Sequence, residues 1–76
     1  MERAITGSII SAQLGNLGKK KYGFIGVKTE DLKEFKIKVA AETKYETLDV
    51  GSRVHIVAEL IGDMGIMTAK SIMFVQ

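Results

Sequence analysis

Hydrophobic and polar residues alternate along much of this 76-residue chain, with the period of two that is typical of β-strands. The alternation is clearest between residues 22 and 39. Read as two strands, this segment places on one face the apolar residues Ile25, Val27, Phe35, Ile37 and Val39. The opposite face carries Tyr22, Phe24, Lys36 and Lys38. We expect the first face to enter a hydrophobic core and the second to meet solvent.

Five strands are predicted, because runs rich in β-branched residues are separated by glycines and polar turns. Their expected ranges are 3–14, 22–29, 34–41, 53–61 and 66–75, the last with an irregularity near Lys70. We expect a loop at 15–18, a polar turn at 30–33 and a hairpin turn at 62–65. Gly7 lies within the first range, where a glycine often marks a bulge or a sharp bend.

A short helix is expected between the third and fourth strands. Thr43 followed by Glu46 has the spacing of a capping box, and Tyr45 and Leu48 would share one helical face. These residues predict a helix over about 44–48 that ends before Gly51. Three strands, a short helix and two more strands is the element order of the OB-fold, a five-stranded Greek-key barrel. The expected fold class is therefore all-β, with one OB-fold domain over residues 1–76.

Composition limits the chemistry available to the chain. It has no cysteine and one histidine, His55, so a disulfide framework and a thiolate metal site are excluded and a zinc site is not expected. No serine or threonine is paired with histidine and aspartate as nucleophilic catalysis requires, and residues 15–19 lack the spacing of a phosphate-binding glycine loop. We therefore expect no enzymatic activity and no cofactor.

The chain also lacks the sequence signals of a membrane or secreted protein. No apolar run approaches the ~18 residues that a membrane-spanning helix needs. The first residues lack the apolar stretch of a signal peptide. A soluble, cytoplasmic protein is the expectation.

Charge is distributed unevenly. The formal net charge is only +2 at pH 7, but residues 19–38 hold seven lysines against three acidic residues. The rest of the chain holds four basic and six acidic residues. A basic segment on an otherwise acidic chain suits an anionic partner. The alternative is that these lysines only solvate a surface and protect an edge strand.

Aromatic residues accompany the lysines on the predicted solvent face. Exposed rings stack on unpaired bases and lysines contact phosphates, which is how single-stranded nucleic acid is bound. The candidate binding residues are Lys19, Lys20, Lys21, Tyr22, Phe24, Lys36, Lys38 and, outward on the fourth strand, Arg53. The alternative is a register slip of one residue near Gly23 or Gly26, which would bury Phe24.

Glycine and hydrophobic positions over nearly the whole length form a recognisable frame. It comprises Gly7-x-Ile9, Tyr22-Gly23-Phe24-Ile25, Phe35-x-Ile37, Leu48-x-Val50-Gly51-x-x-Val54, Gly65-Ile66 and Ala69-x-x-Ile72. This frame resembles the nucleic-acid-binding OB-fold superfamily, which includes anticodon-binding domains of aminoacyl-tRNA synthetases and single-strand-binding domains of replication proteins. Residues 21–25 are also similar to the first ribonucleoprotein motif of cold-shock proteins, although the third strand lacks the histidine and outward aromatic of their second motif.

The resemblance implies binding of single-stranded DNA or RNA with low sequence specificity. OB-folds also serve as protein-interaction modules, so a subunit of a larger assembly or a homo-oligomer is the alternative. The last strand bears on this choice. Met73 and Phe74 are expected in the core or a packed edge, and an exposed Phe74 would indicate a subunit contact.

Overall fold

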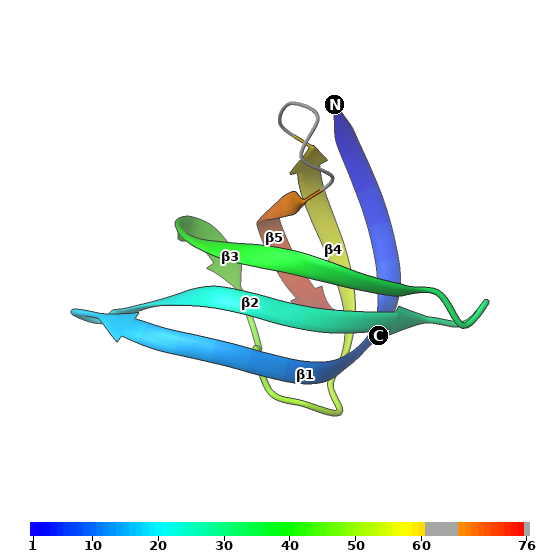
Figure 1. Ribbon diagram of the computed structural model, residues 1–76, viewed down its shortest axis with the longest axis horizontal. Helices are drawn as coiled ribbons and strands as arrows, with labels where there is room; N and C mark the ends of the chain where they lie inside the picture. The colour runs from blue at the N-terminus through cyan, green and yellow to red at the C-terminus, as the bar shows by residue number, and fades with distance from the viewer. Residues whose placement is uncertain (61–65, 76) are drawn as a thin grey trace.

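Each predicted strand is present in the computed structural model, which describes residues 1–60 and 66–75 (Figure 1). The strands are β1 (Glu2–Leu17), β2 (Lys20–Thr29), β3 (Glu34–Tyr45), β4 (Arg53–Leu60) and β5 (Met67–Phe74). The described residues contain no helix, so the fold is all-β. Ile61 and the predicted turn at 62–65 lie outside the described residues.

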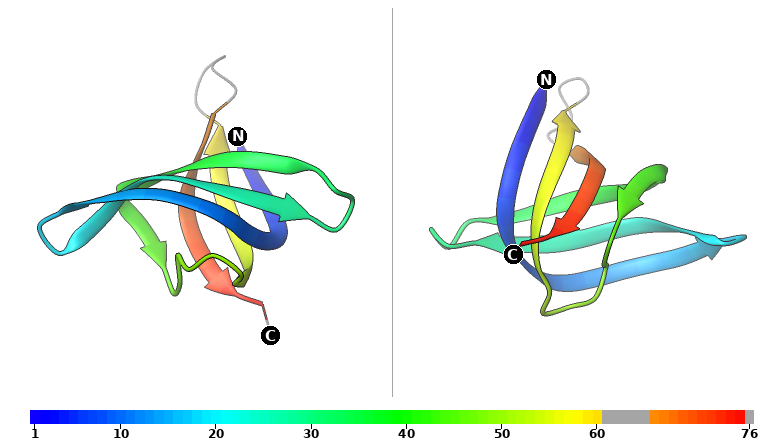
Figure 2. Two further views of the ribbon diagram at one scale, coloured as in Figure 1. Left: turned by 60° about the horizontal axis from the view of Figure 1, so that its bottom comes forward. Right: turned by 180° about the vertical axis from the view of Figure 1, so that it is seen from behind.

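The five strands close into a barrel in the order β1-β2-β3-β5-β4. All neighbouring pairs are antiparallel except β3 and β5, which run parallel. The long first strand joins both parts of the barrel, because Glu2–Ser8 pair with β4 and Gly7–Leu17 pair with β2. Figure 2 shows the resulting bend, with the β1–β2–β3 layer crossing over β4 and β5.

Gly7 lies where β1 passes from one partner strand to the other. A Cβ at this position would sit 2.4 Å from the carbonyl oxygen of Lys28, so only glycine allows the strands to come this close. The expected bulge is three residues further along, where the β1–β2 register shifts between Ile9 and Ser11 and leaves Ile10 unpaired. A bulge of this kind bends its strand and re-aims the neighbouring side chains.

The core is formed by the inward positions of all five strands. Its largest fully buried side chains are Ile9, Ile25, Val27, Ile37, Val39, Val54, Ile56 and Ile72. The alternation predicted for residues 22–39 is therefore confirmed, with Phe35 half-buried and packed against the core. Met67 is also buried, whereas Met73 is 39% and Phe74 51% exposed, so the expectation that these two residues are packed is wrong.

The predicted helix over residues 44–48 is wrong. β3 continues through Tyr45, which pairs with Ile72 of β5, and the chain then runs irregularly to β4 with Leu48 buried. Thr43 explains the difference, because its buried hydroxyl donates to the carbonyl oxygen of Ala69 at 2.6 Å and accepts from the amide of Ala40 at 3.0 Å. A side chain that sequence spacing assigns to a helix cap instead bridges two strands.

The hairpin between β1 and β2 is longer than predicted. The strands extend through Leu17 and resume at Lys20, so only Gly18 and Lys19 form the turn that was expected over residues 15–18. Gly18 adopts a φ of +64° there, a conformation that glycine takes without strain. The hairpin end projects beyond the barrel (Figure 1, left). No helix among residues 1–60 and 66–75 is long and apolar enough to cross a membrane.

Candidate nucleic-acid interface

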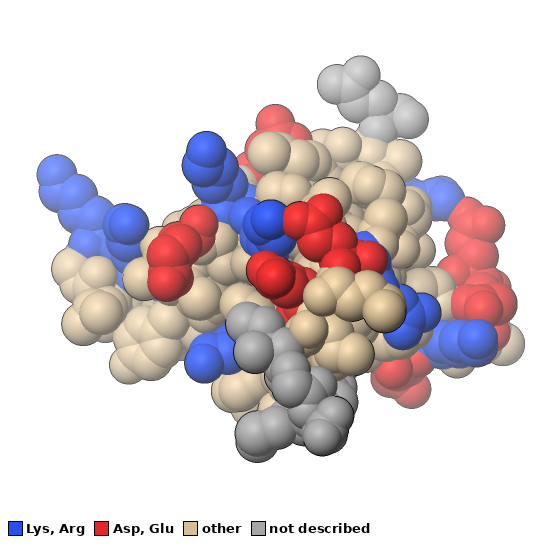
Figure 3. All heavy atoms as spheres, turned by 90° about the horizontal axis from the view of Figure 1, so that it is seen from above, with Lys and Arg blue, Asp and Glu red and all other residues tan. Residues whose placement is uncertain are grey.

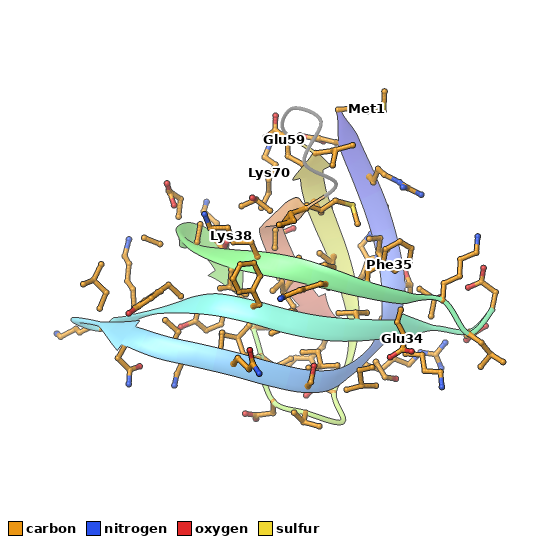
Figure 4. The ribbon with its side chains drawn as sticks, viewed as in Figure 1. Met1, Glu34, Phe35, Lys38, Glu59 and Lys70 are labelled. Atoms are coloured by element: carbon orange, nitrogen blue, oxygen red, sulfur yellow. The ribbon has the colours of Figure 1, made fainter. Side chains whose placement is uncertain are left out.

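The outer face of β1, β2 and β3 gathers most of the predicted binding residues. In the strand register, Phe24 lies between Gln13 and Lys38, and Gly26 lies between Ser11 and Lys36. Side chains that are paired across neighbouring strands project from the same side of a sheet. Figure 4 labels Glu34, the first residue of β3, and Lys38, further along the same strand. We call this surface the β1–β2–β3 face.

Tyr22 is outward on β2, as the alternation predicts, and is 48% exposed. Its ring lies against Gly15, its neighbour on β1, because a Cβ at Gly15 would be 3.0 Å from the ring carbon Cζ. The backbone of β1 thus supports the ring where a larger residue would displace it. A supported, half-exposed ring is suited to stacking on a base.

Phe24 is also outward, but it is only partly exposed. The Nζ of Lys36 lies 4.7 Å from the centroid of its ring, within the range of a cation–π interaction. The next residue, Ile25, is buried, so the register slip that would have buried Phe24 does not occur. The arrangement places an aromatic surface and a positive charge side by side.

A depression of about 430 Å³ opens beside Phe24. Gly26 forms part of its lining, and a Cβ there would lie 2.4 Å from the hydroxyl oxygen of Ser11, so the glycine allows the Ser11 side chain to pack closely over β2. The other side chains around it are Ile10, Gln13, Phe24, Ile25, Glu34, Phe35 and Lys36. The contribution of β1 has no signal in the sequence, because the bulge at Ile10 decides which β1 residues share the face with Phe24.

The remaining predicted lysines lie at the end of the β1–β2 hairpin. Lys19 is in the turn and Lys20 and Lys21 begin β2, all three exposed. By strand alternation Lys20 shares a face with Tyr22 and Phe24, whereas Lys21 points to the opposite side. Figure 3 shows basic side chains at this end of the molecule (left).

The lysines of the candidate interface form no ion pairs with the described residues, so they are available to a ligand. Within residues 1–60 and 66–75, the basic partners of ion pairs are Lys33, Lys70 and Arg53. None of these lies on the β1–β2–β3 face. Lysines without a carboxylate partner keep their full charge for an anionic ligand.

Arg53 is separate from the other predicted residues. It begins β4 opposite Ser8 of β1, and its guanidinium contacts the carboxylate of Glu30 in the turn after β2. The structure therefore does not bring Arg53 together with Tyr22 and Phe24. The alternation in the sequence predicted that Arg53 points outward, but it could not predict which outer surface of the barrel Arg53 would join.

A second groove, of about 620 Å³, is lined by the second half of β3, the first half of β5 and residues of β1 and β4. Its carboxylates are Glu2, Glu42 and Glu59, against the ammonium groups of Lys44 and Lys70 (Figure 4 labels Glu59 and Lys70). The hydrogen bond from Lys70, 2.6 Å long, lowers the pKa of Glu2 below its ordinary value, so this carboxylate stays charged. An excess of carboxylates disfavours phosphate, and the groove is a weaker candidate than the β1–β2–β3 face.

The described residues offer no candidate metal site. They contain no cluster of three or more metal-ligating side chains. His55 is exposed on β4, and its Nδ1 is 2.8 Å from the hydroxyl oxygen of Thr6.

Comparison of the chain with protein-family models, with curated proteins and with solved structures found no match.

Proposed function

We propose that this protein is an OB-fold module that binds single-stranded DNA or RNA on the β1–β2–β3 face. The observation that carries the proposal is the outward pair Tyr22 and Phe24 on β2, flanked by Lys36 and Lys38 on β3. The strand order β1-β2-β3-β5-β4 supports the OB-fold assignment. In that fold the strand 2–3 face and the loop between strands 1 and 2 bind oligonucleotides.

Stacking and charge would contribute differently to binding. Each base stacked on Tyr22 or Phe24 stabilises the complex by about 1–3 kcal/mol, largely independent of sequence. Lys20, Lys36 and Lys38 would contact phosphates, and this part of the affinity weakens steeply with salt because counterions are released. The proposed activity is therefore tight at low salt and tolerant of base sequence.

The proposal is tested by fluorescence anisotropy of labelled oligo-dT and oligo-U of about 15 nucleotides, near the upper site size of one OB-fold. Wild type, Tyr22→Ala and Phe24→Ala are titrated at low and at physiological salt. Tyr45→Ala is the matched control, because Tyr45 is also exposed but lies at the far end of β3. Each interface variant is expected to bind about 5- to 100-fold more weakly than wild type. Unchanged affinity in both variants would contradict the proposal.

A protein-interaction module is the second candidate function, and two observations favour it. Phe74 is 51% exposed near the end of the barrel. In addition, β1 pairs with β4 only as far as Ser8, so its edge from Ser11 to Leu17 faces no other described strand and carries no charged residue. An uncharged free edge can pair with another chain. Light scattering over a range of concentrations distinguishes the two candidates, because a self-associating chain gains mass without any oligonucleotide.

A further inference from the structure

Besides Lys36, three side chains that can form hydrogen bonds border the depression at Gly26, and they form none with one another. Ser11 and Gln13 approach it from β1, and Glu34 approaches it from β3. Within the described part of the chain, the side-chain hydrogen bonds involve none of these three residues. Their donors and acceptors are therefore free for a ligand in the depression.

Glu34 is the exceptional residue of this group. It is exposed, it is the one acidic side chain that lines the depression, and it lies on a face that otherwise carries lysines. A carboxylate repels a neighbouring phosphate, so a purely backbone-binding surface gains nothing from it. It is, however, a strong acceptor for the N–H groups of a base.

The two sides of the depression have complementary chemistry. An ionised carboxylate only accepts hydrogen bonds, whereas the amide of Gln13 and the hydroxyl of Ser11 can donate them. Gly26 lies between these sides on the middle strand and adds no side chain of its own to the depression. Phe24 supplies a ring at the same place.

We propose that this depression is a base-reading subsite with a preference for guanine. Guanine presents two adjacent donors, N1–H and the exocyclic N2 amino group, and beside them the acceptor O6. The donors fit the two carboxylate oxygens of Glu34, and O6 accepts from Gln13 or Ser11. Thymine and uracil present one donor between two carbonyl oxygens, so they leave part of this set unpaired. The inference rests on the proposed single-strand-binding function and adds a base preference to it.

The test compares labelled oligonucleotides of about 15 nucleotides that differ in one central base. The host is oligo-dT, and the central base is thymine, guanine or inosine, which keeps N1–H and O6 but lacks the N2 amino group. We expect the guanine oligonucleotide to bind about tenfold more tightly than oligo-dT, as a bidentate base contact provides. Inosine is expected to lose most of this gain.

Glu34→Gln is the decisive variant, because it keeps the size of the side chain and removes its charge. It is expected to bind oligo-dT as well as wild type or better, since repulsion of phosphate is relieved, and to lose the preference for guanine. Glu42→Gln removes the same charge from β3 outside the depression and is expected to keep the preference. If Glu34→Gln tightens guanine and thymine oligonucleotides equally, Glu34 only repels phosphate and the inference fails.

The two proposals fail in distinguishable ways. Wild-type protein that binds all three oligonucleotides with equal affinity overturns the guanine subsite and leaves the proposed function intact. Wild-type protein that binds none of them, even at low salt, overturns the proposed function and the subsite with it.

Discussion

The ammonium of Lys36 lies over the ring of Phe24, with Nζ 4.7 Å from the ring centroid. The two residues are not directly paired, because Lys36 faces Gly26 across the strands and Phe24 faces Lys38. Lys36 therefore leans diagonally along the face to reach the ring. Gly26, which lies opposite Lys36, is also part of the lining of the depression. The contact between the aromatic ring and the cation therefore lies beside the depression.

Lys36→Met tests the role of this charge, because methionine retains an unbranched apolar chain. We expect the protein to lose about 0.5–1 kcal/mol of unfolding free energy, the strength of an exposed cation–π contact. We also expect the dependence of log affinity on log salt to become shallower by about 0.7, the loss of one phosphate contact on single-stranded DNA. Lys33→Met is the control, since Lys33 lies in the turn between β2 and β3, near Asp31. If Lys36→Met and Lys33→Met bind with the same salt dependence, Lys36 does not contact a phosphate.

Gly26→Ala should weaken oligonucleotide binding by filling the depression. The new Cβ would lie 2.4 Å from Ser11 Oγ, so we also expect a loss of about 1–3 kcal/mol in unfolding free energy from overpacking. The double variant Ser11→Ala, Gly26→Ala removes this clash, since the Ser11 Cβ is 3.7 Å away. It should regain stability in urea denaturation but still bind more weakly than Ser11→Ala alone. Full binding by the double variant would show that the depression takes no part.

Thr43→Val should destabilise the protein by about 2–4 kcal/mol, because one buried and one partly buried backbone group lose their partner. These groups are the amide of Ala40 and the carbonyl of Ala69, which the Thr43 hydroxyl bridges. Thr43→Ser retains the hydroxyl and is expected to lose only about 1 kcal/mol, for one methyl group. Urea denaturation measures both. Equal stability of the valine and serine variants would mean that the bridge does not hold β3 to β5.

The ion pair of Glu2 and Lys70 predicts a pH-dependent contribution to stability. The hydrogen bond between Lys70 and Glu2 lowers the pKa of Glu2, and the same hydrogen bond raises the pKa of Lys70. The lowered pKa means that the contribution of Glu2 is present above the pKa of an unfolded glutamate, roughly 4.3, and is lost as the pH falls. The raised pKa means that the contribution of Lys70 is lost only as the pH rises above roughly 10.4.

The difference in melting temperature between wild type and Lys70→Met is therefore expected at pH 7 and should shrink toward pH 2. It should also shrink at high salt, because both groups are exposed. The double variant Glu2→Gln, Lys70→Met should differ in melting temperature from the single variant Glu2→Gln by an amount that does not change with pH. A difference that persists unchanged at pH 2 would mean that Lys70 stabilises the protein through its apolar stem.

The alternation of apolar and polar residues correctly predicted which side chains point into the core, wherever the strand register is regular. Ile25 and Val27 are inward and Tyr22 and Phe24 outward, as their spacing requires. The helix prediction failed because Thr43 and Tyr45 interact with β5, about 25 residues away along the chain. Local spacing cannot reveal a partner at that distance.

The candidate site was predictable on β2 and β3 and not on β1. The register shift after Ile9 decides which β1 side chains join the face, and a one-residue shift exchanges inward and outward positions. Ser11, Gln13 and the depression they border therefore had no sequence signal. Arg53 points outward as predicted, but it lies on β4 beside Glu30, apart from the other candidate residues.

The most direct test of the central claim is a titration of isotope-labelled protein with oligo-dT, followed by amide chemical shifts in NMR spectra. We predict that the shifts concentrate on the β1–β2–β3 face, at residues such as Gln13, Tyr22, Gly26 and Lys38. Amides of His55 on β4 and Val50 in the connection before it should change little. Shifts that instead centre on Phe74 and β4, or no shifts at low salt, would contradict the claim that this face binds single-stranded nucleic acid.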